Sequence, residues 1–172
     1  MGKIFNYDSK FFAGMTKVSD TIIINILFVI CSIPIVTIGA SITALYSVSM
    51  KITRDEDIYA AKEFIKQFKQ NFKQSTIIWI ILLVIGLFIG LDFYLCSLMS
   101  DNTISMIFKF IFTIVSVVLA FILIYVFPLT ARFENSIKNT LTNSIFMSIQ
   151  HLPYTLVMSV LAFAPIVSFI LF

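Results

Sequence analysis

One uncharged stretch decides the fold: TIIINILFVICSIPIVTIGASITALYSVSM, which occupies residues 21–50. A helix that crosses about 30 Å of hydrocarbon needs roughly 20 apolar residues, and this stretch is longer than that. Three further apolar stretches follow at residues 75–99, 106–130 and 152–172. They are continuously apolar and not alternating, and backbone groups in lipid must bond within the chain, so they predict helices and exclude a closed barrel.

The composition agrees with a membrane protein. The chain has 172 residues, of which 59% are hydrophobic and 12% charged, and its mean hydropathy is +1.01. Soluble domains carry about 25% charged residues, so a soluble or disordered chain is excluded. Two cysteines are too few for a disulfide scaffold. The sequence therefore predicts an all-α, polytopic membrane helical bundle that forms a single domain over residues 1–172.

The first apolar stretch contains Pro34 and Gly39 near its middle. Proline removes a backbone donor and disfavours helix at the residue before it. The stretch is therefore either one long kinked helix or two helices joined by a break at residues 34–39. Its second half is rich in small residues, which allow helices to approach closely in lipid, so Gly39, Ala40 and Ala44 are candidate residues for a partner interface.

The positive charges predict which side of the membrane each connection faces. Lys and Arg residues gather in the connections 51–74 and 131–151, and none lies in residues 100–103. Because such residues stay on the cytoplasmic side, both connections are predicted to be cytoplasmic. Three lysines in residues 1–20 join them if the first stretch turns back on itself, and lie opposite if it crosses once. The side of the N-terminus therefore stays open.

Two amphipathic helices are predicted in these connections, at residues 59–73 and 132–150. Each has an apolar residue at every fourth position beside a polar or basic stripe, the pattern of helices that lie at the membrane interface against lipids. A partner-docking helix is the alternative for the first. The apolar stripes are Phe64, Phe68 and Phe72 in the first, and Phe133, Ile137, Leu141, Ile145 and Ile149 in the second.

Two charges fall at membrane depth, Asp92 and Lys109. Each lies eight residues from a turn centred on residues 100–101, so a helical hairpin would bring them to equal depth. A charge costs about 2.5–3.5 kcal/mol at the centre of a membrane helix, which favours pairing. The sequence predicts an intramembrane ion pair, either structural or part of a proton or substrate relay. In the same region, Gly86 and Gly90 form a GxxxG pattern that indicates a close helix contact.

No pattern indicates bond chemistry. The sequence has no HExxH, no glycine-rich phosphate loop and no nucleophile elbow, and His151 is the only histidine. The adjacent acids Asp55, Glu56 and Asp57 are typical of a solvated turn or a helix start. We therefore expect no enzyme activity, no cofactor, no metal site and no nucleic-acid partner.

Three runs carry a family resemblance: NILFVICSIPIVTIGASITALYSVSMKITRDED, FIKQFKQNFKQSTIIWIILLVIG and FPLTARFENSIKNTLTNSIFMSIQHLP. They resemble the YesL family of small bacterial membrane proteins, most specifically in IPIVTIGA at residues 33–40 and FKQNFKQ at residues 68–74. The resemblance implies a bacterial cell membrane. The family's genomic settings further imply a role beside carbohydrate importers of the ABC class in Gram-positive bacteria.

Residues 134–153 are similar, more weakly, to the cytoplasmic coupling loop of ABC importer permeases. Glu134 stands nineteen residues before Pro153, and Leu152 with Pro153 matches the closing pair of such loops. Asn135 and Ser136 replace the two alanines that follow the glutamate. The resemblance implies that an ATPase subunit docks here.

The sequence as a whole predicts a non-enzymatic accessory or regulatory subunit of an oligosaccharide ABC importer, in contact with its permease, its ATPase or both. The alternative is a small stand-alone transporter or channel, acting alone or as a homo-oligomer, with Asp92 and Lys109 as its only candidate polar path. The candidate partner-contact residues are Gly39, Ala40, Ala44, Gly86, Gly90, Glu134, Leu152 and Pro153.

Overall fold

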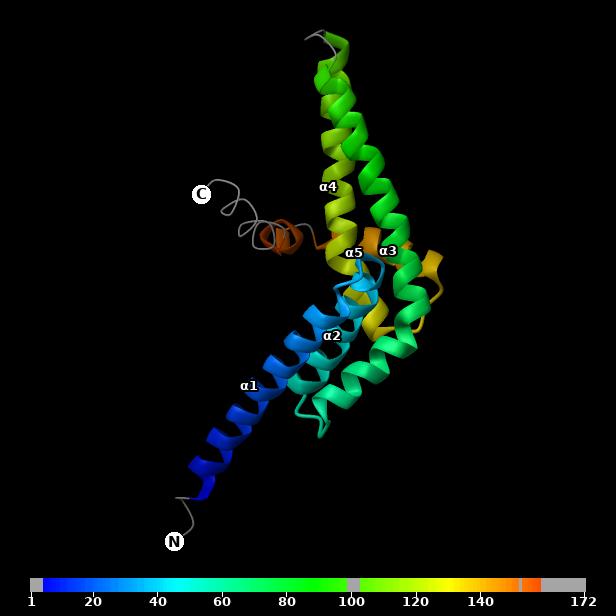
Figure 1. Cartoon of the computed structure of the whole chain (residues 1–172). Helices are drawn as coiled ribbons and strands as arrows, with labels where there is room; N and C mark the ends of the chain where they lie inside the picture. The colour runs from blue at the N-terminus through cyan, green and yellow to red at the C-terminus, as the bar shows by residue number, and fades with distance from the viewer. Residues whose placement is uncertain (1–4, 99–102, 152, 159–172) are drawn as a thin grey trace. The chain divides into compact units, whose positions relative to one another are not determined.

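The computed structural model describes residues 5–98, 103–151 and 153–158, and this part of the chain is helical without strands. The predicted all-α class is confirmed. Within these described residues, four helices are long and apolar enough to cross a membrane, as expected of a multi-pass membrane protein. The elements, shown in Figure 1, are α1 (Phe5–Cys31), the 3-10 turn η1 (Ile35–Thr37), α2 (Ile38–Thr53), α3 (Ala60–Leu98), α4 (Thr103–Arg132) and α5 (Ile137–Gln150).

The chain divides into two compact units, Met1–Thr76 and Ile77–Phe172. In the first unit the predicted break is confirmed, because α1 ends at Cys31 and α2 begins at Ile38. The segment 21–50 is therefore two helices and not one kinked helix. Pro34 lies in the break, and the hydroxyl of Thr37 lies 2.6 Å from the carbonyl oxygen of Cys31, which ties the two helix ends together.

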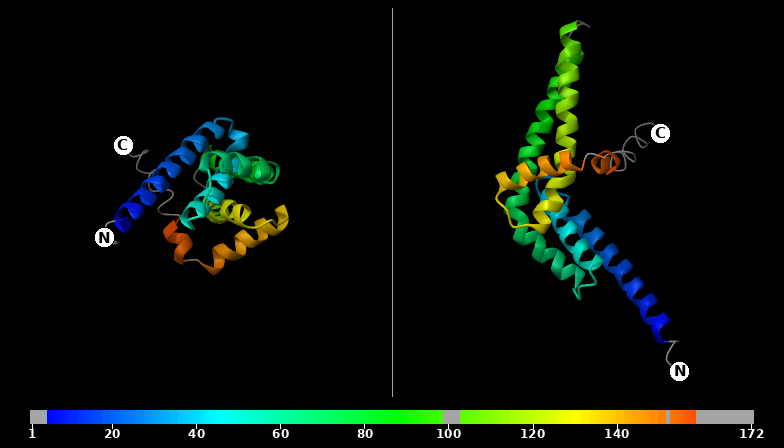
Figure 2. Two further views of the ribbon diagram at one scale, coloured as in Figure 1. Left: turned by 90° about the horizontal axis from the view of Figure 1, so that it is seen from below. Right: turned by 180° about the vertical axis from the view of Figure 1, so that it is seen from behind.

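The two helices α1 and α2 form a hairpin, running in opposite directions side by side (Figures 1 and 2). The start of α3 packs against the same hairpin. Their common core consists of Ile24 from α1, Ala44, Val48 and Ile52 from α2, and Ala60 and Phe64 at the start of α3.

Helix α3 corrects one prediction. Residues 59–73 and 75–99 were expected to form an interfacial helix and a separate span, but Ala60–Leu98 is one continuous helix. The polar run between them contains neither proline nor glycine, so a change in polarity leaves the backbone hydrogen bonds of the helix intact. Phe64 is fully buried and Phe68 packs on the same core, so these two rings contact the hairpin and not lipid. Only Phe72 of that stripe is exposed.

The second unit contains residues 77–98 of α3 beside the antiparallel α4 (Figure 2). Trp79 lies beside Phe127 and Phe93 beside Phe112, each pair with ring centroids 6.2 Å apart. The predicted helix 132–150 also needs correction, because Arg132 ends α4 and α5 begins only at Ile137.

The reason for this later start is a helix cap. Ser136 has an extended backbone, and its hydroxyl oxygen accepts a hydrogen bond from the backbone N–H of Asn139 at 3.4 Å. Such a residue satisfies one of the free N–H groups at a helix start. Of the predicted last span at residues 152–172, only residues 153–158 are described, and they are helical.

The packing face of α5 is a row of small hydroxyl side chains, which the sequence pattern did not single out. Its buried residues are Thr140, Ser144 and Ser148, spaced four apart. Their hydroxyls donate back to carbonyl oxygens of α5 itself or of its cap, as in Ser144 to Thr140 at 2.7 Å. These small side chains let α5 approach α4 closely, which large apolar side chains would prevent. The exposed apolar residues on the outside include Ile145, Phe146 and Ile149.

The same pattern, with small polar side chains buried and large apolar ones exposed, holds through the described part of the chain. Large apolar side chains are mostly exposed, whereas small hydroxyl side chains are repeatedly buried. Helices in lipid gain nothing by hiding apolar groups from one another and associate through small residues and hydrogen bonds. The buried hydroxyl residues include Ser41, Thr43, Ser47, Ser75, Ser105, Thr130, Thr140, Ser144, Ser148 and Thr155.

This packing predicts the effect of Ser144→Leu. Ser144 is fully buried between close helices, so a larger side chain there should lower the free energy of unfolding by about 1–3 kcal/mol. Thr142→Leu is the matched control, because Thr142 is exposed on the same helix and should change stability by no more than about 0.5 kcal/mol. Thermal unfolding in detergent measures both. Equal stability of the two variants would contradict the close α4–α5 contact.

Candidate functional site

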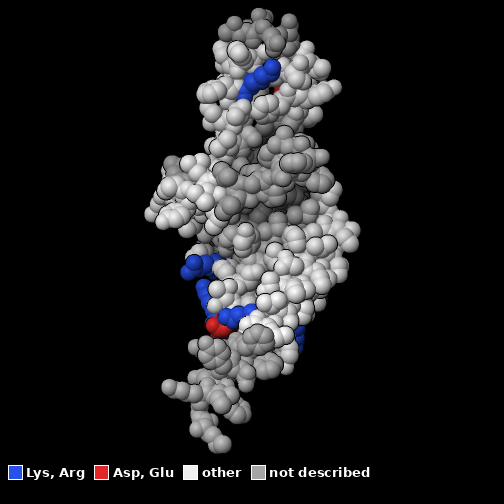
Figure 3. All heavy atoms as spheres, turned by 90° about the vertical axis from the view of Figure 1, so that its left-hand side faces the viewer, with Lys and Arg blue, Asp and Glu red and all other residues white. Residues whose placement is uncertain are grey.

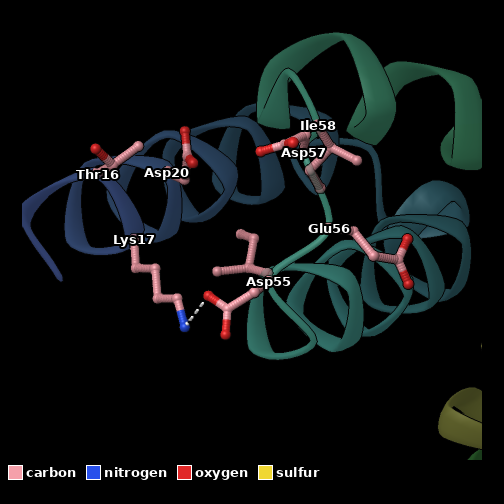
Figure 4. Close-up of a pocket in the computed structure, with 8 residues that line it drawn as sticks. Thr16, Lys17, Asp20, Asp55, Glu56, Asp57 and Ile58 are labelled. Carbon is pink, nitrogen blue, oxygen red and sulfur yellow. Dashed lines mark ion pairs between the residues drawn. The ribbon is translucent and has the colours of Figure 1, made fainter. Parts of the chain in front are cut away.

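Charged side chains gather in a few places on a largely uncharged surface (Figure 3). One place is the open end of the α1–α2 hairpin, which we call the charged base and define as Lys17, Asp20, Lys51, Asp55 and Glu63. Lys17 Nζ lies 2.6 Å from Asp55 Oδ1, and Lys51 Nζ lies 2.5 Å from Glu63 Oε1. The first pair joins α1 to the connection after α2 (Figure 4), and the second joins α2 to α3.

Asp55 holds an unusual backbone conformation. It follows the last turn of α2 with φ of 57°, in the left-handed region. Its N–H donates to the carbonyl oxygen of Ile52, and the N–H of Glu56 donates to that of Lys51, each at 3.2 Å. This is the Schellman ending of a helix, in which glycine is the usual left-handed residue. Asp55 adopts this less favourable backbone conformation, and its carboxylate forms the ion pair with Lys17.

Glu63 is the most enclosed charge of the base. Its carboxylate contacts the ammonium groups of Lys51 and, at 3.6 Å, Lys66, and it accepts a hydrogen bond from Gln67 at 2.9 Å. The hydrogen bond with Lys51 is the main reason why the pKa of Glu63 is lowered. A lowered pKa means that this carboxylate stabilises the fold above its ordinary pKa, and that the contribution is lost as the pH falls through the lowered value.

A pocket of about 280 Å³ opens at the charged base. Its acidic side chains do not converge, since Asp55 points toward Lys17 whereas Glu56 points away (Figure 4). Among the described residues, no group of three His, Cys, Asp or Glu side chains is arranged to hold a metal ion. The arrangement joins helices through ion pairs. The pocket is lined by Thr16, Lys17, Asp20, Ile52, Asp55, Glu56, Asp57 and Ile58.

The candidate contact residues of α2 lie inside the chain. Gly39, Ala40 and Ala44 are all buried, and Ala44 belongs to the core of the first unit. In this conformation they are packed within the chain, and their role in a partner interface stays a prediction. The pattern of small residues correctly indicated a close helix contact, but the contact is internal.

The glycine pair of α3 is different. A Cβ atom added at Gly86 would lie 3.8 Å from Leu119 Cδ2, an ordinary contact, and one added at Gly90 would meet nothing within 4 Å. Within the described chain, therefore, neither glycine is required for a close helix approach. Their role in a contact with a partner stays a prediction.

Asp92 and Lys109 are both partly buried, on α3 and α4. Phe93 lies beside Phe112 and Gly86 lies near Leu119, so the register of the hairpin places Asp92 level with Thr113. Lys109 is then about 6 Å nearer the turn at 1.5 Å per residue. The two charges are thus offset by about one helical turn and not at equal depth, and their pairing stays a prediction.

The segment that resembles a coupling loop surrounds α5. Glu134 and Pro153 are exposed, and Leu152 lies outside the described residues. The end of α5 is fixed to α4 by Thr155, whose hydroxyl lies 2.9 Å from Tyr125 Oη, 3.1 Å from the carbonyl oxygen of Ser148 and 2.9 Å from that of His151. The sequence reasoning missed this contact, although a threonine and a tyrosine in apolar spans are a usable signal for one.

The fold defines the class, a multi-pass α-helical membrane protein. Residues 21–93 match the model of the family described as protein of unknown function, DUF624. The matched region contains the break of the hairpin and most of α3, and supports membership of an uncharacterised family. No curated protein and no solved structure matches the chain.

The left-handed conformation of Asp55 predicts how substitutions at this position change the free energy of unfolding. A left-handed conformation costs a residue with a Cβ atom roughly 1–2 kcal/mol, and an exposed ion pair contributes about 0–1 kcal/mol. Asp55→Gly should therefore keep or raise the free energy of unfolding, and Asp55→Ala should lower it. Thermal unfolding in detergent separates them, with Glu56→Ala as the exposed neighbouring control. If glycine were no better than alanine at position 55, the strained helix end would be refuted.

Proposed function

We propose that this chain is a non-enzymatic accessory subunit of a membrane transport complex, and that the complex is a carbohydrate importer of the ABC class. The observation that carries the accessory role is the outer face of α5. The class of partner rests on the resemblance to the YesL family, seen at residues 33–40 and 68–74.

The outer face of α5 has the composition of a docking surface. Ile145, Phe146 and Ile149 are exposed on it, and Ile149 lies four residues after Ile145 and three after Phe146. An amphipathic helix that presents apolar residues at such spacings can enter a groove of a partner. The inner face is already satisfied by α4, so α5 can engage a partner without breaking contacts of its own.

The flanks of α5 add polar contacts. Glu134 and Lys138 are exposed before and within the first turn of the helix, and His151 is exposed after it. A buried apolar centre with a polar rim is the usual anatomy of a protein interface. We therefore place the ATPase contact on the surface from Glu134 to Pro153, with Phe146 at its centre.

Truncation of Phe146 tests this contact. If the ring fills a pocket of an ATPase subunit, Phe146→Ala should reduce the ATPase recovered with the tagged chain by about tenfold, the size of a central aromatic contact. Phe110→Ala is the matched control, since Phe110 is 69% exposed and Phe146 66%, and Phe110 lies near the other end of α4. Recovery that falls equally in both variants, or in neither, would count against docking through α5.

The competing function is a stand-alone transporter that uses Asp92 and Lys109 as its polar path. We expect the double variant Asp92→Asn with Lys109→Met to leave sugar uptake by intact cells within twofold of the parent chain. Loss of uptake, with membrane insertion and copurified subunits unchanged, would support the transporter instead.

A further inference from the structure

We infer that the α1–α2 hairpin is re-entrant: it enters the membrane from the side of its charged base, and its tip, residues 32–37, ends among lipid acyl chains. The tip is an interaction surface, and its partner is the hydrocarbon of the bilayer. This inference depends on the membrane class of the fold and does not depend on the proposed partner.

The helices of the hairpin are long enough to cross a membrane, but the uncharged part of each is shorter than the hydrocarbon core. Asp20 is the last charge on α1, and eleven residues separate it from the end of that helix at Cys31. At 1.5 Å per residue this is about 16 Å, close to half of the roughly 30 Å hydrocarbon core. The arm of α2 from Ile38 to Met50 has thirteen residues before Lys51, which is about 20 Å.

The charged base fixes how deep the hairpin can go. Lys17 and Asp55 are paired at its mouth, with Asp20 and Lys51 beside them. Drawing these charges into hydrocarbon costs up to about 2.5–3.5 kcal/mol each, so the base stays at the level of the lipid headgroups. A base at that level leaves the inner ends of the two helix arms some 10–14 Å short of the opposite surface, from the arm lengths above.

The exposed side chains of the tip are apolar and therefore suit contact with hydrocarbon and not with water. Ile33, Ile35 and Val36 are 77%, 64% and 51% exposed, and no charge lies between Asp20 and Lys51. The connection between α3 and α4 has the opposite composition, with the polar run SDN at residues 100–102. A tip that reached the aqueous far side would expose three large apolar side chains to water without compensation.

The backbone of the tip also has internal hydrogen bonds, which suit the low dielectric of the bilayer core. Non-helical backbone at membrane depth requires that its polar groups be bonded within the protein. Pro34 has no N–H to satisfy, and the Thr37 hydroxyl lies within bonding distance of the carbonyl oxygens of Cys31 and Pro34. The N–H groups of Ser32, Ile33 and Thr37 donate to carbonyl oxygens of Phe28, Ile30 and Pro34, at 2.9, 3.4 and 3.0 Å.

A re-entrant hairpin also assigns the N-terminus. The start of α1 and the end of α2 lie at the same end of the hairpin, as the ion pair of Lys17 with Asp55 shows. The three lysines in residues 1–20 then share a side with those of residues 51–73, as positive residues of short cytoplasmic segments do.

The depth of the tip can be measured with nitroxide labels on the full chain. In a background with Cys31→Ser and Cys96→Ser, single cysteines at Val36, Leu87, Glu56 and Asn102 are labelled. The protein is reconstituted at high dilution in vesicles of phosphatidylcholine and phosphatidylglycerol. Collision rates with oxygen, which partitions into hydrocarbon, and with a water-soluble nickel chelate then report depth. Circular dichroism confirms that each labelled variant is folded.

We expect the label at Val36 to behave like the one at Leu87, an exposed residue within α3, with frequent oxygen collisions and rare nickel collisions. The labels at Glu56 and Asn102 should show the reverse. Nickel collisions at Val36 as frequent as at Asn102 would mean that the hairpin crosses the bilayer. Rare collisions with both reagents would mean that protein, such as a second copy, covers the tip. Either result overturns the inference.

A second measurement uses intact cells. A charged maleimide added outside should modify the cysteine at Asn102 and leave the one at Val36 unmodified, both before and after the cells are made permeable. Modification at Val36 from either side, at a rate within threefold of that at Asn102, would also overturn the inference.

Discussion

The structure depends on one constraint of the lipid environment: a helix there must satisfy its polar groups internally and can gain contact only by coming close to its neighbour. The buried hydroxyls show how the chain meets it. Thr43 donates to the carbonyl oxygen of Gly39 at 2.9 Å, so the hydroxyl of Ser75, also 2.9 Å away, must donate to Thr43. One pair of small side chains thus holds α2 to α3 without leaving a donor unmatched. The same device recurs where Tyr125 meets Thr155.

The class of the fold and the break in the first apolar stretch could be predicted, because charge depletion and the proline at position 34 act locally. The boundary of α3 could not, because polarity changes near Lys73 while the helix-forming tendency of the backbone does not. The packing face of α5 could not be predicted, because the sequence pattern assigned only its apolar stripe, and assigned that to the membrane interface. The covered face is the one with small side chains, and Ser144 lies at its centre.

The candidate site was predictable only in part. Glu63 is the only acid among the lysines of residues 58–73, and that isolation was a signal for an ion pair. Its partner Lys51 could not be identified, because the pairing depends on how α2 ends at a left-handed Asp55. For Gly39, Ala40 and Ala44 the pattern identified a helix contact correctly, but one sequence does not show whether the neighbour is in the same chain.

Helix α3 belongs to both compact units, since the boundary between them falls between Thr76 and Ile77 within an unbroken helix. No linker is available there to absorb a change of length. One residue inserted between Ile77 and Leu98 would rotate the later side chains of α3 by about 100° and advance them by about 1.5 Å relative to α4. Insertions and deletions in homologous chains should therefore be tolerated in residues 54–59 and 133–136, and selected against between Ala60 and Leu98.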